Sequence, residues 1–272
     1  MRTGKIKDQI GTSEVGGFID IAASLPGSVF VVPHYDSGTG KDTEITINNS
    51  SEDSVRVHLF FISPAGVLSQ NTYVTIVAGE SEQVKASVID SGNTGLVLGV
   101  ASDGAGKFIS FNYLTASIRY YDTDYDGSFS AFTFKALVEE TSGATLLNFN
   151  GLYLEPQPYS VSFLNVRSDS FVAFAKLNGV LATGLDLITS LNLKTQSLSG
   201  QGSVFLNPRV CQVSGVLSTL YPSLVSHLST DPIGRLFANC SFAMIINKGT
   251  TAGKIMDDGS RVSSIVTIPV IP

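Results

Sequence analysis

Three aspartates in one short turn are the residues best spaced to do chemistry. Asp122, Asp124 and Asp126 stand at alternate positions, and Gly127 follows them. Carboxylate oxygens with this spacing before a glycine are typical of calcium-binding loops. The twelfth position of an EF-hand loop would be Thr133 rather than glutamate, so other loops would have to supply further ligands. We therefore expect no cofactor other than calcium at these aspartates, and the alternative is a solvated hairpin turn.

Tyrosines beside this turn are candidates for ligand binding. Tyr120, Tyr121 and Tyr125 lie next to or within it. Exposed flat rings stack on sugars, and although the chain has no Trp, three tyrosines could form a smaller platform for a glycan. The alternative is that the three rings pack against neighbouring strands inside a hairpin.

Catalytic motifs are absent from the sequence. Gly-x-Ser-x-Gly, His-Glu-x-x-His and the phosphate-binding Gly-x-x-x-x-Gly-Lys-Ser/Thr do not occur. His34 and Asp36 could form half of an acid–base pair, which makes a hydrolase the third function class to consider. We expect no catalytic residues and a protein that is not an enzyme.

Two cysteines are candidates for a disulfide. Cys211 and Cys240 would close a loop whose entropy contributes about 3–4 kcal/mol to stability, and such a bond would indicate an oxidising compartment. The alternative is a pair of buried free thiols.

The composition narrows the classes of partner. The net charge is −6 and the pI is near 5.0, so the chain lacks the basic surface that nucleic-acid binding requires. No run of about 18 apolar residues is present to span a bilayer as a helix. Charged residues are only 15% of the chain, whereas ordinary domains have about 25%, and serine, threonine, asparagine and glycine take their place. Such a surface is common in exported and virion proteins.

Short runs with a period of two dominate the chain and predict an all-β fold. Turn-forming residues separate these runs, and no long helical pattern intervenes to connect parallel strands. Pro33 is expected to end the first apolar run. The expected strands span residues 29–32, 43–48, 55–62, 72–77, 82–89, 96–101, 108–121, 128–138, 160–166, 171–177, 185–193, 203–206, 238–246 and 262–270.

The spacing of these strands predicts two antiparallel β-sandwich domains, Ig-like or jelly-roll-like, with a short helical insertion. Residues 1–17 lack a period and are expected to form a flexible arm. The first sandwich is expected over 18–140 and a second β-rich domain over 145–272. Apolar residues three and four apart predict the helix near 215–228.

Several motifs resemble those of uncharacterised secreted bacterial sandwich proteins. They are Val32-Pro-His-Tyr35, the glycines of 38–40, Thr43-Glu-Ile-Thr-Ile-Asn-Asn49, Phe108-Ile-Ser-Phe-Asn-Tyr113 and Ala131-Phe-Thr-Phe-Lys-Ala-Leu137. The resemblance covers mainly residues 27–138. It implies export and a structural or adhesive role, although the N-terminus has no apolar signal segment after its basic residues.

Taken together, the sequence predicts a non-enzymatic structural, surface or assembly protein that acts through β-sheet interfaces. The alternative is a calcium-assisted adhesin that binds a glycan or a protein. We expect self-association or another protein partner, at the cell surface or outside the cell, with a virion as the alternative location. The uncharged β-rich tail at 262–270 could pair within its own domain or add to a neighbouring sheet.

Overall fold

The strands of the described part of the chain pair in antiparallel sheets, and its helices are short, which confirms the all-β prediction. The structure is a computed structural model. It describes residues 18–21, 26–122, 125–136, 139–141, 144–148, 159–162, 169–175, 180–182, 194–197, 203–205, 212–220, 222, 235–238 and 242–246.

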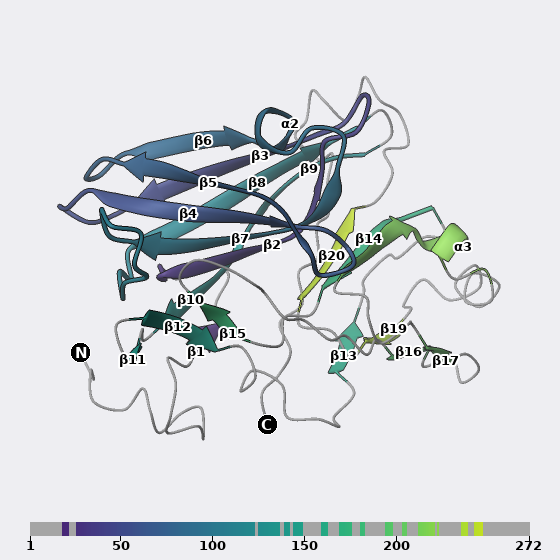
Figure 1. Ribbon diagram of the computed structural model, residues 1–272. Helices are drawn as coiled ribbons and strands as arrows, with labels where there is room; N and C mark the ends of the chain where they lie inside the picture. Colours follow the sequence, from purple (N-terminus) through teal and green to yellow (C-terminus); the bar gives the residue numbers. More distant parts are fainter. Residues whose placement is uncertain are drawn as a thin grey trace.

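Two sheets stack face to face in the N-terminal half (Figure 1). The larger has the order β1-β10-β2-β7-β4-β5, and the smaller has the order β6-β3-β8-β9. The strands of the larger sheet are β1 (Phe18–Ile21), β2 (Val29–Asp36), β4 (Val55–Ile62), β5 (Leu68–Ile76), β7 (Thr94–Ser102) and β10 (Phe132–Ala136). Those of the smaller sheet are β3 (Asp42–Asn49), β6 (Ser81–Lys85), β8 (Leu114–Tyr121) and β9 (Asp126–Ser130).

The alternation of side chains explains how the sheets pack. In β3, Ile45 and Ile47 are fully buried while their neighbours are half-buried, as the period of two predicts. The central strands β4 and β7 are buried along nearly their whole length, which agrees with the apolar runs Leu59–Ile62 of β4 and Leu96–Ala101 of β7. One hydrophobic cluster fills the space between the sheets and includes Phe30, Phe61 and Val97.

The C-terminal half forms three smaller antiparallel sheets. Their orders are β18-β14-β20, β11-β12-β15 and β13-β19-β16-β17. Their strands are β11 (Glu139–Thr141), β12 (Ala144–Asn148), β13 (Tyr159–Ser162), β14 (Phe171–Ala175), β15 (Val180–Ala182), β16 (Lys194–Ser197), β17 (Ser203–Phe205), β18 (Gln212–Val216), β19 (Arg235–Ala238) and β20 (Phe242–Ile246).

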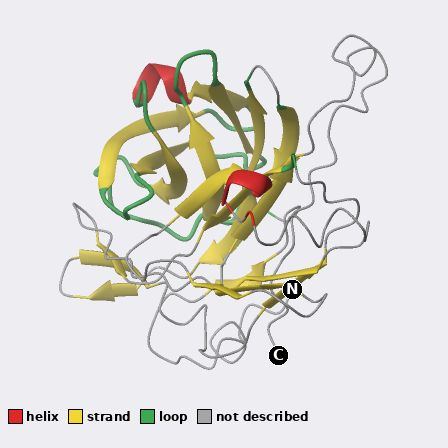
Figure 2. Ribbon diagram, turned by 90° about the vertical axis from the view of Figure 1, so that its right-hand side faces the viewer, coloured by secondary structure: helices red, strands yellow, loops and turns green. Residues whose placement is uncertain are grey.

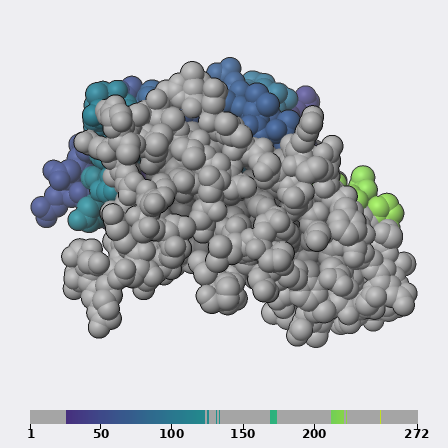
Figure 3. Space-filling model, turned by 60° about the horizontal axis from the view of Figure 1, so that its bottom comes forward, coloured from purple at the N-terminus to yellow at the C-terminus, as the bar shows by residue number. Residues whose placement is uncertain are grey.

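The described residues include two short helices, α2 (Ala86–Ile89) and α3 (Leu217–Leu220) (Figure 2). α3 confirms part of the helical segment predicted at 215–228, and it lies at the right-hand margin of the view in Figure 3. α2 replaces the second half of the strand predicted at 82–89. Asp42 explains its position, because the Asp42 carboxylate accepts hydrogen bonds from the backbone N–H and the hydroxyl of Ser87. Within the described residues, no helix has the length and apolar character needed to cross a membrane.

Several predicted strand boundaries are wrong. β5 begins at Leu68 rather than at residue 72, β8 begins at Leu114 rather than at residue 108, and the run predicted over 238–246 contains the end of β19 and the whole of β20.

Two further boundaries depend on how the strands pair. β2 continues through Pro33 to Asp36, with a register shift against β7 at Pro33. The run predicted as one strand over 128–138 is two strands, since the chain crosses at Ala131 from the smaller sheet into the larger one. Ala131 is fully buried, and its N–H donates to Ala116 O at 2.8 Å.

Part of the C-terminal half packs on the first sandwich. β14 and β20 lie beside one end of β2 (Figure 1). Phe171, Ala173 and Ile246 belong to the same hydrophobic cluster as the side chains between the two large sheets. The three-stranded sheet β18-β14-β20 therefore shares the core of the N-terminal sandwich. A separate second sandwich over 145–272 stays a prediction.

Candidate functional site

A β-bulge in β2 positions His34, the more deeply buried of the two buried histidines in the described part of the chain, at the junction of the two halves. Val32 pairs with Val97 and Tyr35 pairs with Gly95, so β2 has one residue more than β7 across this interval. Pro33 lacks an N–H, and a bulge is one of the few places where a sheet accepts proline. The pairing of β2 with β10 covers only residues 29–31, so β10 does not cover His34.

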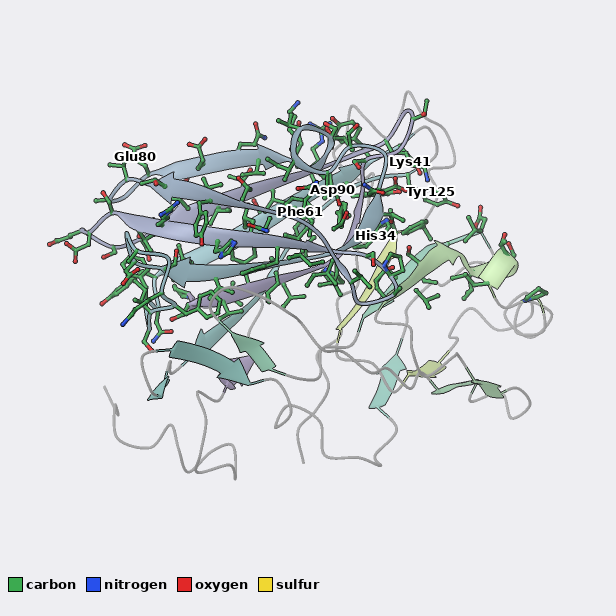
Figure 4. The ribbon with its side chains drawn as sticks, in the orientation of Figure 1. His34, Lys41, Phe61, Glu80, Asp90 and Tyr125 are labelled. Atoms are coloured by element: carbon green, nitrogen blue, oxygen red, sulfur yellow. The ribbon has the colours of Figure 1, made fainter. Side chains whose placement is uncertain are left out.

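His34 contacts residues from three elements. Its Nδ1 accepts a hydrogen bond of 3.0 Å from Nε2 of Gln212 at the start of β18. Its ring centroid lies 5.0 Å from that of Phe171 on β14 and 5.2 Å from that of Tyr120 on β8. His34 Nε2 and Gln212 Oε1 are buried without a hydrogen-bond partner. Figure 4 shows His34 at the end of the sandwich that also contains Lys41 and Tyr125.

Burial keeps this imidazole neutral. The pKa of His34 is lowered from 6.5 to about 3, mainly because burial removes its hydration; the negative Asp36 opposes this shift, and the positive Lys41 adds to it. The Asp36 carboxylate binds Lys41 Nζ at 3.0 Å and accepts the N–H of Gly38. His34 and Asp36 thus have different partners, and the buried imidazole is not presented to an external substrate.

The predicted acidic turn is the end of the β8–β9 hairpin. Asp122 Oδ1 accepts the backbone N–H of Tyr125 at 2.6 Å, and Asp122 Oδ2 lies 3.8 Å from Lys41 Nζ. Asp126 already pairs with Tyr121 as the first residue of β9, and Asp124 lies outside the described residues. Elsewhere in the described part of the chain, no group of three His, Cys, Asp or Glu side chains could hold a metal ion. Calcium binding stays a prediction.

The tyrosines beside this turn point mainly into the protein. Tyr120 is fully buried and Tyr125 nearly so, while Tyr121 is half-buried. The Tyr125 hydroxyl donates to Asp169 O at 2.7 Å, and its ring lies 5.6 Å from that of Phe171. These positions fit the alternative of packing within the hairpin, and they leave Tyr121 as the most accessible ring for a ligand. Burial is the main cause that raises the pKa of Tyr120.

A second polar cluster, absent from the sequence-based candidates, lies in the same end of the sandwich (Figure 4). The Tyr35 hydroxyl donates to Asp90 Oδ2, and Asp90 Oδ1 accepts from Ser69 Oγ at 2.9 Å and Asn93 Nδ2 at 2.7 Å. Ser37 Oγ donates to Asn93 O at 2.9 Å. Burial and the Asp90 carboxylate raise the pKa of Tyr35. Every Asp90 oxygen has a donor, so the cluster fixes the turn between α2 and β7 rather than offering a free reactive group.

The edge strand β5, unlike the two buried polar clusters, presents an accessible surface. It is the last strand of the larger sheet, and β4 is its only hydrogen-bonded neighbour among the described strands. Its sequence, LSQNTYVTI, contains no charged residue and no proline. Exposed hydrophobic side chains occur on and beside it: Val67 is 63% exposed, Tyr73 is 38% exposed and Val77 is 57% exposed.

Sequence reasoning did not single out β5 or the partner of His34. The uncharged run between Val67 and Val77 was the available signal for an edge strand, but only the strand order shows which strand is at the edge. Gln212 is 178 residues from His34, and nothing in the sequence pairs them. Cys211 and Cys240 lie outside the described residues.

Comparisons with known proteins add little. No family model matches the chain, and no curated protein matches it. A similar solved structure, entitled "Crystal Structure of Thermotoga maritima 1070", is 8% identical with a TM-score of 0.33. The similarity covers 41% of this chain and 98% of that chain, and it is too remote to support an argument about fold or function.

Proposed function

We propose that this protein is a non-enzymatic structural or assembly protein that associates through the β5 edge of its larger sheet. A second copy of the chain or another protein is the partner. The observation that supports the proposal best is a nine-residue edge strand without a charge or a proline. The weakly charged surface favours a place at a cell surface, outside the cell or on a virion.

Unprotected edges are unusual in soluble β-proteins. An edge strand offers a row of unpaired N–H and C=O groups, and proteins block such rows with lysine, proline, bulges or very short strands. β5 has one of these devices, a register shift against β4 near Ser69. From Gln70 to Ile76 the pairing with β4 is regular, so this segment is suited to accept another strand.

The outward side chains of β5 also suit a protein partner. Asn71, Tyr73 and Thr75 are exposed, while Val74 and Ile76 turn toward the core. Of the five large hydrophobic side chains exposed in the described part of the chain, three lie on or next to β5. Aromatic and β-branched residues make favourable pairs across strands, each contributing about 0.2–1 kcal/mol.

A matched pair of substitutions tests the proposal. Tyr73→Glu places a negative charge on the edge strand. The Tyr73 ring that this substitution removes lies 3.8 Å from the Arg56 guanidinium. Tyr113→Glu makes the same change at a tyrosine that is 50% exposed and outside every strand. We expect light scattering to show association of the wild type and of Tyr113→Glu, and at least about tenfold weaker association of Tyr73→Glu, or about 1.4 kcal/mol. A monomeric wild type at high concentration would contradict self-association, and equal effects of the two substitutions would contradict the role of β5.

A further inference from the structure

The three-stranded sheet β18-β14-β20 forms one wall of the N-terminal core. Phe171 is almost fully buried, and its ring lies 5.5 Å from that of Tyr120 in a stacked arrangement. Hydrogen bonds also link these surfaces: Gln212 N donates to Pro64 O at 3.2 Å, and the Tyr125 hydroxyl donates to Asp169 O. The contact thus combines buried rings with hydrogen bonds.

His34 occupies the centre of this contact. Among the described residues, Gln212 provides the only hydrogen bond to its side chain, and Phe171 and Tyr120 pack against its ring. Nδ1 must be unprotonated to accept from the Gln212 amide nitrogen, which makes the imidazole neutral in the docked arrangement. Protonation would turn Nδ1 into a donor. A flip of the Gln212 amide would restore that one bond, but it would leave a buried cation without a hydrogen-bonded carboxylate.

The ionisable groups around His34 would stabilise its protonated form only weakly. Strands β7, β14, β18 and β20 contain no ionisable residue. Asp36 on β2 is bound to Lys41, whose positive charge opposes protonation of His34. Among the described residues, the other ionisable groups at this contact are Tyr120 and Asp122 on and after β8, Tyr125 before β9 and Asp169 before β14. Asp122 accepts the Tyr125 N–H and lies near Lys41.

We propose that protonation of His34 releases β18-β14-β20 from β2, so that this sheet is an acid-operated cover on the N-terminal sandwich. Release exposes the rings of Tyr120 and Tyr125, which creates a new apolar surface at the end of the sandwich where β2 and β8 end. The inference is independent of the association through β5, because His34 lies on β2, which is separated from β5 by β7 and β4.

The size of the pH effect follows from the linkage between protonation of His34 and docking of the sheet β18-β14-β20. The docked form holds the pKa of His34 at about 3, whereas a hydrated imidazole has 6.5. Since the docked value is the lower one, docking is fully stable above pH 6.5 and weakens as the pH falls toward 3. Between pH 7 and pH 4.5, the ratio of released to docked protein rises about 100-fold.

Hydrogen exchange of the full chain tests this proposal. Peptides from β14 and β18 report on the cover, and peptides from β3 report on the sandwich. After correction for intrinsic exchange, we expect the wild type to lose about 100-fold protection in β14 and β18 between pH 7 and pH 4.5 relative to β3. His34→Gln, which is neutral at both pH values, should remove this difference. His58→Gln is the control, because His58 lies on β4 and bonds to Asn71 within the larger sheet.

Unchanged protection of β14 and β18 in the wild type would overturn the proposal, as would the same acid-induced loss in His34→Gln. If His34→Gln does not dock at pH 7, the imidazole ¹⁵N signals of the wild type decide the question. A His34 that titrates near 6.5 while β14 stays protected would overturn the proposal, and one that becomes charged only as β14 loses protection would support it.

Discussion

Phe171→Ala should destabilise the whole N-terminal sandwich, although Phe171 lies outside the segment predicted for that domain. The ring contacts those of His34, Tyr120 and Tyr125, at centroid distances of 5.0, 5.5 and 5.6 Å. All three partners belong to the N-terminal half: His34 lies on β2 of the larger sheet, Tyr120 lies on β8 of the smaller sheet, and Tyr125 directly precedes β9. Truncation therefore removes atoms from a core that both halves share.

The expected loss can be worked from this environment. Truncating a buried phenylalanine to alanine costs about 3–5 kcal/mol through lost burial and the cavity that remains. Phe171 is only 6% exposed, and aromatic pairs add about 0.5–1.5 kcal/mol beyond the burial of area, so we expect the upper part of this range, about 4 kcal/mol. This loss is a large fraction of the free energy of unfolding of a typical folded domain, which is about 5–15 kcal/mol.

Guanidinium unfolding followed by circular dichroism measures the free energy of unfolding, and hydrogen exchange locates the loss. Peptides from β3 and β8 should lose protection together with β14. Val67→Ala is the control, because this side chain is 63% exposed and its truncation should change stability by less than about 0.5 kcal/mol. If β3 and β8 keep the protection of the wild type in Phe171→Ala, the ring of Phe171 stabilises only the docking of β14, and the shared core does not stabilise the sandwich itself.

Two further substitutions test the packing and the polar cluster. Gly99→Ala should lower stability by about 2–3 kcal/mol, because an added Cβ would lie 2.1 Å from the Phe30 ring. Gly104→Ala is the control and should be nearly neutral, because the space around Gly104 is open. Equal melting temperatures for the two variants would contradict this packing. Tyr35→Phe should cost about 1–3 kcal/mol, because it removes the buried hydroxyl that donates to Asp90, and a melting temperature equal to that of the wild type would show that the bond contributes nothing.

Local sequence patterns correctly predicted the strands in which the burial of side chains follows the sequence directly. Residues 55–62 form β4 as expected, and the alternating Ile45 and Ile47 share the buried face of β3. The hairpin around Asp122 was also predicted, since turn residues between two β-rich runs are a local signal. In these segments, the side chains alone determine which face is buried.

The misplaced boundaries depend on contacts that are distant in sequence. Pro33 normally ends a central strand, but β2 absorbs it in a bulge at a point that β10 does not cover. Ala131 reads as part of a continuous strand, and only the stacking of two sheets explains the crossing there. A helix of four residues after Lys85 depends on the Asp42 carboxylate, which is 45 residues away from Ser87.

The candidate site was predicted in part. His34 was singled out, yet as half of an acid–base pair with Asp36. Its observed partners, Gln212 and Phe171, come from strands in the other half of the chain. Because burial depends on that long-range packing, the sequence could not show that the imidazole is enclosed and neutral.

The proposed association through β5 is tested most directly by the exchange of its own backbone amides at increasing protein concentration. In an antiparallel pair with β4, alternate N–H groups of Gln70–Ile76 point away from the sheet and exchange freely in the monomer. The account predicts that these amides gain protection as the concentration rises, while amides in β3 do not change, with or without millimolar calcium. Association that leaves the β5 amides unprotected would contradict it.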